Sequence, residues 1–259
     1  PVQAPSFVRP GGHALLRSKA QGSPLKCATM RKAALFCLLL WATPLAAAAK
    51  TPVVVELFTA QGCASCGEAN AYVGKLAQRD GVLPLTFSVD YWNYLGWTDT
   101  FAKPEFTERQ KAYVERLDLR EPYTPQVVID GHAQAGGLQT EKVERLIGQA
   151  EKADRDPPDM AFIGPRRVDV GSGRVPRGGA EVWLVRYDPR ERDVVVKKGD
   201  NRGQTVSHHN VVREIKRLGP WRGRPTAYRL PPSAEDGLET VVLVQGANGG
   251  RIIAVEIRD

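Results

Sequence analysis

The chain has 259 residues, a formal net charge of +7 and a mean hydropathy of −0.32. This length suits one large domain or two modest ones. Six of the 36 basic residues lie within residues 1–49, which hold no acidic residue, and the rest of the chain balances 30 basic against 29 acidic residues. A broad basic surface of the kind that attracts nucleic acid is therefore excluded, and we expect no nucleic-acid partner.

Residues 30–49 are typical of a secretory signal peptide. Met30 precedes two basic residues, an apolar run that ends at Ala42, and four alanines. A positive start, a short apolar stretch and small residues near the cleavage site define such peptides. We therefore expect residues 1–29 to be an untranslated or disordered leader and the mature chain to be periplasmic or secreted, without a stable membrane span. The alternative is an uncleaved anchor, for which the apolar stretch is short.

Between residues 50 and 155 the sequence predicts alternating strands and helices. The first apolar run is continuous and rich in β-branched residues, which is typical of a strand buried on both faces. In chain order we expect strands and helices at 53–58 (strand), 64–78 (helix), 82–89 (strand), 105–117 (helix), 126–129 (strand) and 140–152 (helix). This order predicts an α/β domain.

Residues 156–259 have a different sequence pattern, which begins at a segment with two adjacent prolines. Short β-like runs separated by Gly, Pro and Asn predict a small all-β domain, sandwich or barrel-like. The runs are 182–187, 194–196, 211–215, 227–230, 241–245 and 252–257.

Cys63 and Cys66 are the only cysteines that follow the predicted signal peptide. They lie at a predicted strand-to-helix turn, where unpaired helix N–H groups stabilise a thiolate at Cys63 and make it nucleophilic. Cys66 can then resolve a mixed disulfide. We predict a redox-active pair. The alternatives are a structural disulfide and a metal clip, although a zinc site needs about four ligands and the nearest histidine is far off in sequence.

Thr124 and Pro125 form a second marker of this chemistry. A proline at the start of a strand, after the charged helix, predicts a cis peptide bond that faces the cysteine turn. The alternative is an ordinary trans proline at a strand entry.

The strand, the CxxC turn, the helix and the Thr-Pro pair together resemble the thioredoxin superfamily. More closely, ELFTAQGCASC at 56–66, DYWNYLGW at 90–97 and HHNVVR at 208–213 resemble domain-of-unknown-function family 1223. The resemblance implies an exported thioredoxin-like protein without a settled activity. The chain departs from ordinary thioredoxin, because no Trp precedes Cys63 and Ala-Ser replaces Gly-Pro between the cysteines, so the direction of electron transfer stays open.

Other residues are candidates for supporting roles. Glu56, seven residues before Cys63, is a possible proton relay to Cys66, and the alternative is an edge residue that reaches solvent. Aromatic residues after the second strand form a possible substrate-binding platform, and the alternative is packing against the core. The candidates are Tyr91, Trp92 and Trp97.

These observations predict an exported thiol–disulfide oxidoreductase with Cys63, Cys66, Thr124 and Pro125 at its catalytic site. Its expected partners are protein or small-molecule thiols and disulfides, and no cofactor or metal is expected. One alternative is a Cu(I)-binding chaperone that uses the two thiolates, although Met160 is the only methionine after the signal peptide. Another is a non-catalytic thioredoxin-like interaction module.

Overall fold

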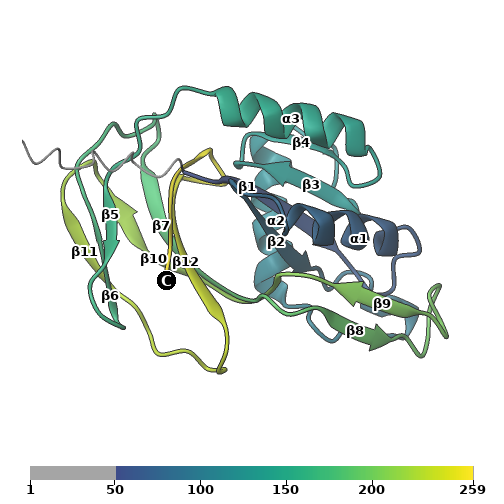
Figure 1. The fold of residues 1–259 in the computed structure, drawn as a ribbon. Helices are drawn as coiled ribbons and strands as arrows, with labels where there is room; N and C mark the ends of the chain where they lie inside the picture. Colours follow the sequence, from purple (N-terminus) through teal and green to yellow (C-terminus); the bar gives the residue numbers. More distant parts are fainter. Residues whose placement is uncertain (1–50, 259) are drawn as a thin grey trace, which may run out of the picture. The chain divides into compact units, whose positions relative to one another are not determined.

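The computed structural model describes residues 51–258 (Figure 1). The predicted leader at 1–29 and signal peptide at 30–49 lie outside this part of the chain. Within it, every helix is too short or too polar to cross a membrane.

An eight-stranded mixed sheet forms the framework of the described residues (Figure 1). Its strand order is β13-β12-β7-β10-β2-β1-β3-β4, with β1 parallel to β2 and antiparallel to β3. The strands are β1 (Val53–Thr59), β2 (Val82–Ser88), β3 (Gln126–Ile129), β4 (Ala133–Gly136), β7 (Ala180–Asp188), β10 (Val211–Trp221), β12 (Glu239–Gly246) and β13 (Ile252–Ile257).

Three helices and one 3₁₀ turn pack around the first half of the sheet. They are α1 (Cys66–Leu76), η1 (Asn93–Leu95), α2 (Pro104–Arg116) and α3 (Thr140–Lys152). Successive side chains of a strand point to opposite faces, so β1 contributes to two cores. Val55 packs with residues of α1 and α3, whereas Phe58 packs with Phe106 and Tyr113 of α2. The predicted burial of this strand on both faces is confirmed.

The second half of the chain is mostly β, as predicted, but its longest strands extend the first sheet. β10 runs parallel to β2, where Val211 pairs with Thr86. Thr86 N donates to Asn210 O at 2.9 Å across the same junction. The expected all-β segment is therefore joined to the α/β part by backbone pairing, which a sequence pattern does not reveal. The domain division between residues 155 and 156 stays a prediction.

A three-stranded sheet covers one face of these added strands. It consists of β5 (Met160–Phe162), β6 (Arg167–Val170) and β11 (Thr226–Arg229). Its residues share a core with β7 and β12, centred on the buried side chains of Trp221 and Leu230. Two layers of strands thus enclose this core.

A separate two-stranded hairpin reaches the first half of the molecule. It comprises β8 (Arg192–Val195) and β9 (Thr205–His208), and it lies beside α1 (Figure 1). The approach is close at Gly74 of α1, where a Cβ atom would lie 2.5 Å from the ring of His209. At its other end, the hairpin's turn reaches the cysteine motif through Asn201.

Candidate functional site

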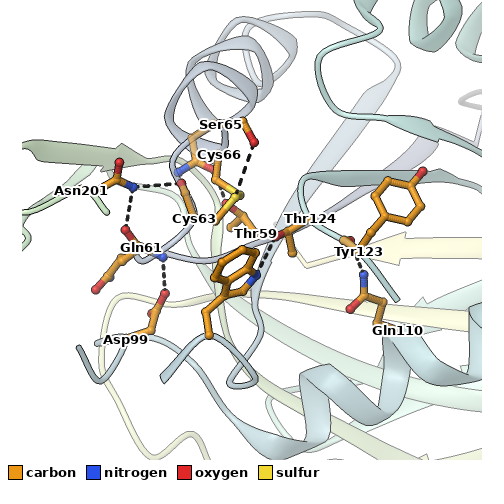
Figure 2. The surroundings of a disulfide bond; sticks show 12 residues. Thr59, Gln61, Cys63, Ser65, Cys66, Asp99, Gln110, Tyr123, Thr124 and Asn201 are labelled. Atoms are coloured by element: carbon orange, nitrogen blue, oxygen red, sulfur yellow. Dashed lines mark hydrogen bonds between the residues drawn. A yellow bond between two sulfur atoms is a disulfide. The ribbon is translucent and has the colours of Figure 1, made fainter. Parts of the chain in front are cut away.

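Cys63 and Cys66 form a disulfide between the end of β1 and the start of α1, with their Cα atoms 5.4 Å apart (Figure 2). The bond belongs to the same buried cluster as Phe58 and Phe87. Cys63 is 2% exposed and Cys66 is fully buried. The sequence predicted Cys63 as the residue that meets a partner, and of the two it is the one with any accessible surface.

The helix begins later than the sequence predicted. The expected start was residue 64, but α1 begins at Cys66 with Ser65 as its N-cap residue. Cys63 therefore lies in the turn before the helix, where its carbonyl accepts a 3.1 Å hydrogen bond from Cys66 N. The Ser65 hydroxyl lies 3.7 Å from Cys63 Sγ. It is placed to donate to a Cys63 thiolate once the bond is reduced.

Two side chains from distant segments hold the turn before Cys63 (Figure 2). Asp99, between η1 and α2, accepts a hydrogen bond from Gln61 N at 2.6 Å. Asn201, in the β8–β9 turn, donates from Nδ2 to Gln61 O at 2.8 Å and to Cys63 O at 2.9 Å. Both side chains are buried, so the backbone that carries Cys63 is fixed from both sides.

The aromatic segment after β2 packs around this turn through its polar atoms. Trp97 Nε1 donates to Gln61 Oε1 at 2.9 Å. Trp92 Nε1 donates to Thr124 Oγ1 at 2.7 Å, and Trp92 packs against the cluster that contains the disulfide. Burial raises the pKa of Tyr91 to about 12, which keeps its phenol protonated. Tyr91 packs against the same cluster as Trp92, so all three predicted aromatic residues are near the site. The two indole N–H groups are engaged within the protein.

The Thr124–Pro125 peptide bond is cis, as the sequence predicted. Thr124 lies beside the disulfide in Figure 2. The segment is anchored to α2 by Gln110, whose Nε2 donates to Tyr123 O at 2.8 Å and to Gln126 Oε1 at 2.9 Å. The structure thus gathers four predicted site residues around one strand-to-helix turn, namely Cys63, Cys66, Thr124 and Pro125.

Gly137 allows the proline segment to approach α1 closely. Its N–H donates to Pro125 O at 2.8 Å. A Cβ atom at this position would lie 2.8 Å from the Cβ of Pro125 and 2.9 Å from the Cβ of Ala69. No side chain fits there without displacing the proline segment or the helix.

Glu56 is fully buried, which excludes the alternative of a solvent-reaching edge residue. Its carboxylate accepts hydrogen bonds from Arg109 Nε at 2.7 Å and from the hydroxyl of Tyr113. Burial raises the pKa of Tyr113 well above its ordinary value, so the phenol remains a donor. Both hydrogen-bond partners lie on α2, and the predicted proton relay to Cys66 stays a prediction.

A buried acid–base pair lies behind the turn. Burial raises the pKa of Asp99, although backbone N–H groups of Gln61 and Phe101 oppose the shift. Burial lowers the pKa of His208, which the nearby Asp99 opposes. The His208 ring packs edge-on against Phe101 at 5.3 Å between centroids. The His208 ring therefore packs against the segment 99–101, in which Asp99 binds Gln61 N.

Sequence reasoning missed three residues that build the site. Asn201 falls in a segment that reads as an ordinary hairpin turn, and Asp99 and Gly137 lie in loops without a motif. Each acts on a residue at least 12 positions away, so local spacing carries no signal of the contact. An invariant Asn, Asp and Gly in related sequences would be the signal to seek.

Comparisons with known proteins agree with this architecture. A family profile described as "Protein of unknown function (DUF1223)" matches residues 54–245. The crystal structure of protein AGR_C_4864 from Agrobacterium tumefaciens is similar at 34% identity and a TM-score of 0.64, covering 79% of this chain and 92% of that one. HBP35 of Porphyromonas gingivalis, at 12% identity and a TM-score of 0.52, covers 80% of this chain and 74% of that chain and is similar in fold alone. A search among curated proteins finds no match.

Proposed function

The chain belongs to the DUF1223 family, and we propose that it is a thioredoxin-like thiol–disulfide oxidoreductase that acts in the periplasm or after secretion. The observation that carries the proposal is the placement of the Cys63–Cys66 disulfide at the start of α1, beside the cis Thr124–Pro125 bond. The signal-peptide pattern at residues 30–49 supports an exported location, where disulfides persist.

The dithiol form would reduce a partner disulfide in two exchange steps. The Cys63 thiolate attacks one sulfur of the partner, forms a mixed disulfide and releases the first partner thiolate. The Cys66 thiolate then attacks Cys63 Sγ, which forms the Cys63–Cys66 disulfide and releases the second partner thiolate. Two electrons pass from the chain to the partner. The same steps in reverse oxidise a partner dithiol.

The surrounding groups have separate tasks in this scheme. The first N–H groups of α1 and the Ser65 hydroxyl stabilise negative charge on Cys63. Asn201 and Asp99 hold the backbone of the turn, so that the thiolate forms in a fixed position. The Thr124–Pro125 segment borders the disulfide and is the place where a partner chain would lie during exchange.

The test is disulfide exchange by the purified mature chain with a fluorescent peptide disulfide. We expect Cys63→Ser to abolish both exchange and mixed-disulfide formation. Cys66→Ser is expected to stop turnover but to leave a trapped mixed disulfide, because Cys63 is still able to attack. Ser233→Ala, which changes an exposed serine between β11 and β12, is the control and keeps both thiols and the whole cysteine site. Unchanged exchange by Cys63→Ser would contradict the proposal.

A further inference from the structure

A pocket of about 300 Å³ lies outside the cysteine site, and three arginines line it. It is formed where the segment after α3, the β6–β7 connection and the start of β13 meet. The arginines are Arg155, Arg174 and Arg251, one from each of these three segments. Three guanidinium groups around one small pocket form a concentration of hydrogen-bond donors.

Arg155 is held in place but keeps free donor capacity. Its Nη2 binds Asp130 Oδ2 in an ion pair and also donates to Ala150 O at 3.0 Å. Its Nη1 is buried and takes no acceptor among residues 51–258. The guanidinium is therefore anchored on one side and unsatisfied on the other.

Arg251 is the least satisfied of the three. Its side chain makes no hydrogen bond or ion pair within the described part of the chain, although the residue is half-buried and its Nη2 is inaccessible. A buried donor on a charged group that lacks an acceptor costs free energy, and a bound water or ion is one explanation for such a group in a folded protein. Arg174 is exposed and also lacks a partner among the described residues.

Within residues 51–258, the acidic residues nearby form an ion pair with Arg155 but none with Arg174 or Arg251. Asp130 is fully buried and is already bound to Arg155 and to Val54 N. Asp154 and Asp156 also line the pocket, but both are exposed, and neither forms an ion pair with an arginine that the structure describes. The guanidinium groups of Arg174 and Arg251 thus have no acidic partner among the described residues.

The neighbouring histidine adds little positive charge to this region. Burial lowers the pKa of His132 and the guanidinium of Arg251 lowers it further, while the charge of Asp130 opposes the shift. His132 is therefore biased towards its neutral form, and the arginines are the cationic groups of this region.

We propose that this pocket binds a small organic oxyanion, a carboxylate or a phosphate monoester, through Arg251, Arg174 and Arg155. Guanidinium groups bind both oxyanions in bidentate geometry. The apolar lining supplied by Pro176 and Ile253 would contact the body of the ligand. The volume is at the lower end of ligand pockets, which favours a small molecule.

The test is calorimetric titration of the mature chain at low ionic strength with phenyl phosphate, benzoate and inorganic phosphate. We expect saturable binding of at least one of the two aromatic probes, and the one that binds more tightly identifies the oxyanion. Arg251→Gln should weaken binding about tenfold or more, because a charge-assisted hydrogen bond is lost. Added salt should weaken it as well.

Two further variants keep the proposal falsifiable if Arg251→Gln fails to fold. Arg174→Gln changes an exposed residue and should weaken binding without affecting the unfolding midpoint. Arg177→Gln lies in the same connection but does not line the pocket, and it should bind as the wild type does. No heat of binding for any probe, or equal affinity in Arg174→Gln and Arg177→Gln, would overturn the proposal.

Discussion

Asn201 Nδ2 donates a 2.9 Å hydrogen bond to the carbonyl oxygen of Cys63, a residue 138 positions earlier in the chain. The same amide nitrogen binds Gln61 O. The turn of the β8–β9 hairpin therefore forms part of the cysteine site, although the hairpin belongs to the β-rich second half. The partial negative charge on the Gln61 and Cys63 carbonyl oxygens disfavours a thiolate on Cys63. The N–H groups of the Asn201 amide offset this charge and so favour the thiolate.

We expect Asn201→Ala to raise the pKa of the Cys63 thiol and to make the disulfide harder to reduce. A loss of about one pKa unit of stabilisation corresponds to about 1.4 kcal/mol, which for a two-electron couple is a shift of about 30 mV towards more negative potential. Thiolate absorbance against pH and equilibration with glutathione measure the two quantities. Arg202→Ala, the exposed neighbour, is the matched control. An unchanged potential in Asn201→Ala would show that the contact is structural only.

Glu56→Gln should strongly destabilise the protein. Glu56 and Arg109 are 1% and 6% exposed in their side chains, so the variant leaves Arg109 buried without a carboxylate. Breaking a buried pair in this way costs about 3–5 kcal/mol, measured as the free energy of unfolding in urea.

Glu144→Gln provides the comparison for Glu56→Gln. It breaks a pair with Arg79 in which both side chains are more than a third exposed, and surface pairs contribute about 1 kcal/mol or less. Equal losses in the two variants would mean that the buried charge on Arg109 is satisfied in another way.

Gly137→Ala should damage the site through steric contact. The added methyl would lie within 3 Å of both Pro125 and Ala69. Overpacking of this kind costs about 1–3 kcal/mol, and we expect slower disulfide exchange because the proline segment must move. Gly148→Ala in α3 meets no atom within 4 Å. It should raise the free energy of unfolding by about 0.5–1 kcal/mol through helix propensity. A Gly137→Ala protein with wild-type stability and exchange rate would contradict this argument.

The sequence predicts the first half of the fold well because its signals are local. The strand at Gln126–Ile129 and the helix at Thr140–Lys152 have the predicted bounds, and the cis bond at Pro125 is confirmed. Continuous β-branched runs and helical periodicity act over a few residues, within reach of pattern reasoning.

The remaining features depend on contacts between distant segments. The pairing of β10 with β2 joins residues more than 120 positions apart, so the strands beyond residue 180 read as a separate domain. The partners of Glu56 also depend on a distant segment. The position of Glu56 on a strand is compatible with a buried side chain or with one that reaches solvent at an edge. Arg109 and Tyr113 become its partners only because α2 packs against this strand.

The buried histidine beneath the site predicts a loss of stability in mild acid. Burial lowers the pKa of His208 from its ordinary value of 6.5, so below that pH the unfolded chain binds more protons than the folded one. Stability should therefore be full above about pH 6.5 and should fall as the pH drops towards the folded-state pKa, by up to about 1.4 kcal/mol per pH unit.

Urea unfolding midpoints across this pH range, in the wild type and in His208→Gln, measure the effect. Burial also lowers the pKa of His132, so His208→Gln should remove only part of the slope and the double variant with His132→Gln should remove more. Asp99 acts in the opposite sense, because burial raises its pKa above 3.8 and its contribution to stability declines as the pH rises. Because His208 lowers the pKa of Asp99, His208→Gln changes both contributions, and a double-mutant cycle with Asp99→Asn separates them. Identical slopes in the wild type and His208→Gln would mean that the folded chain accommodates a protonated His208 at no cost.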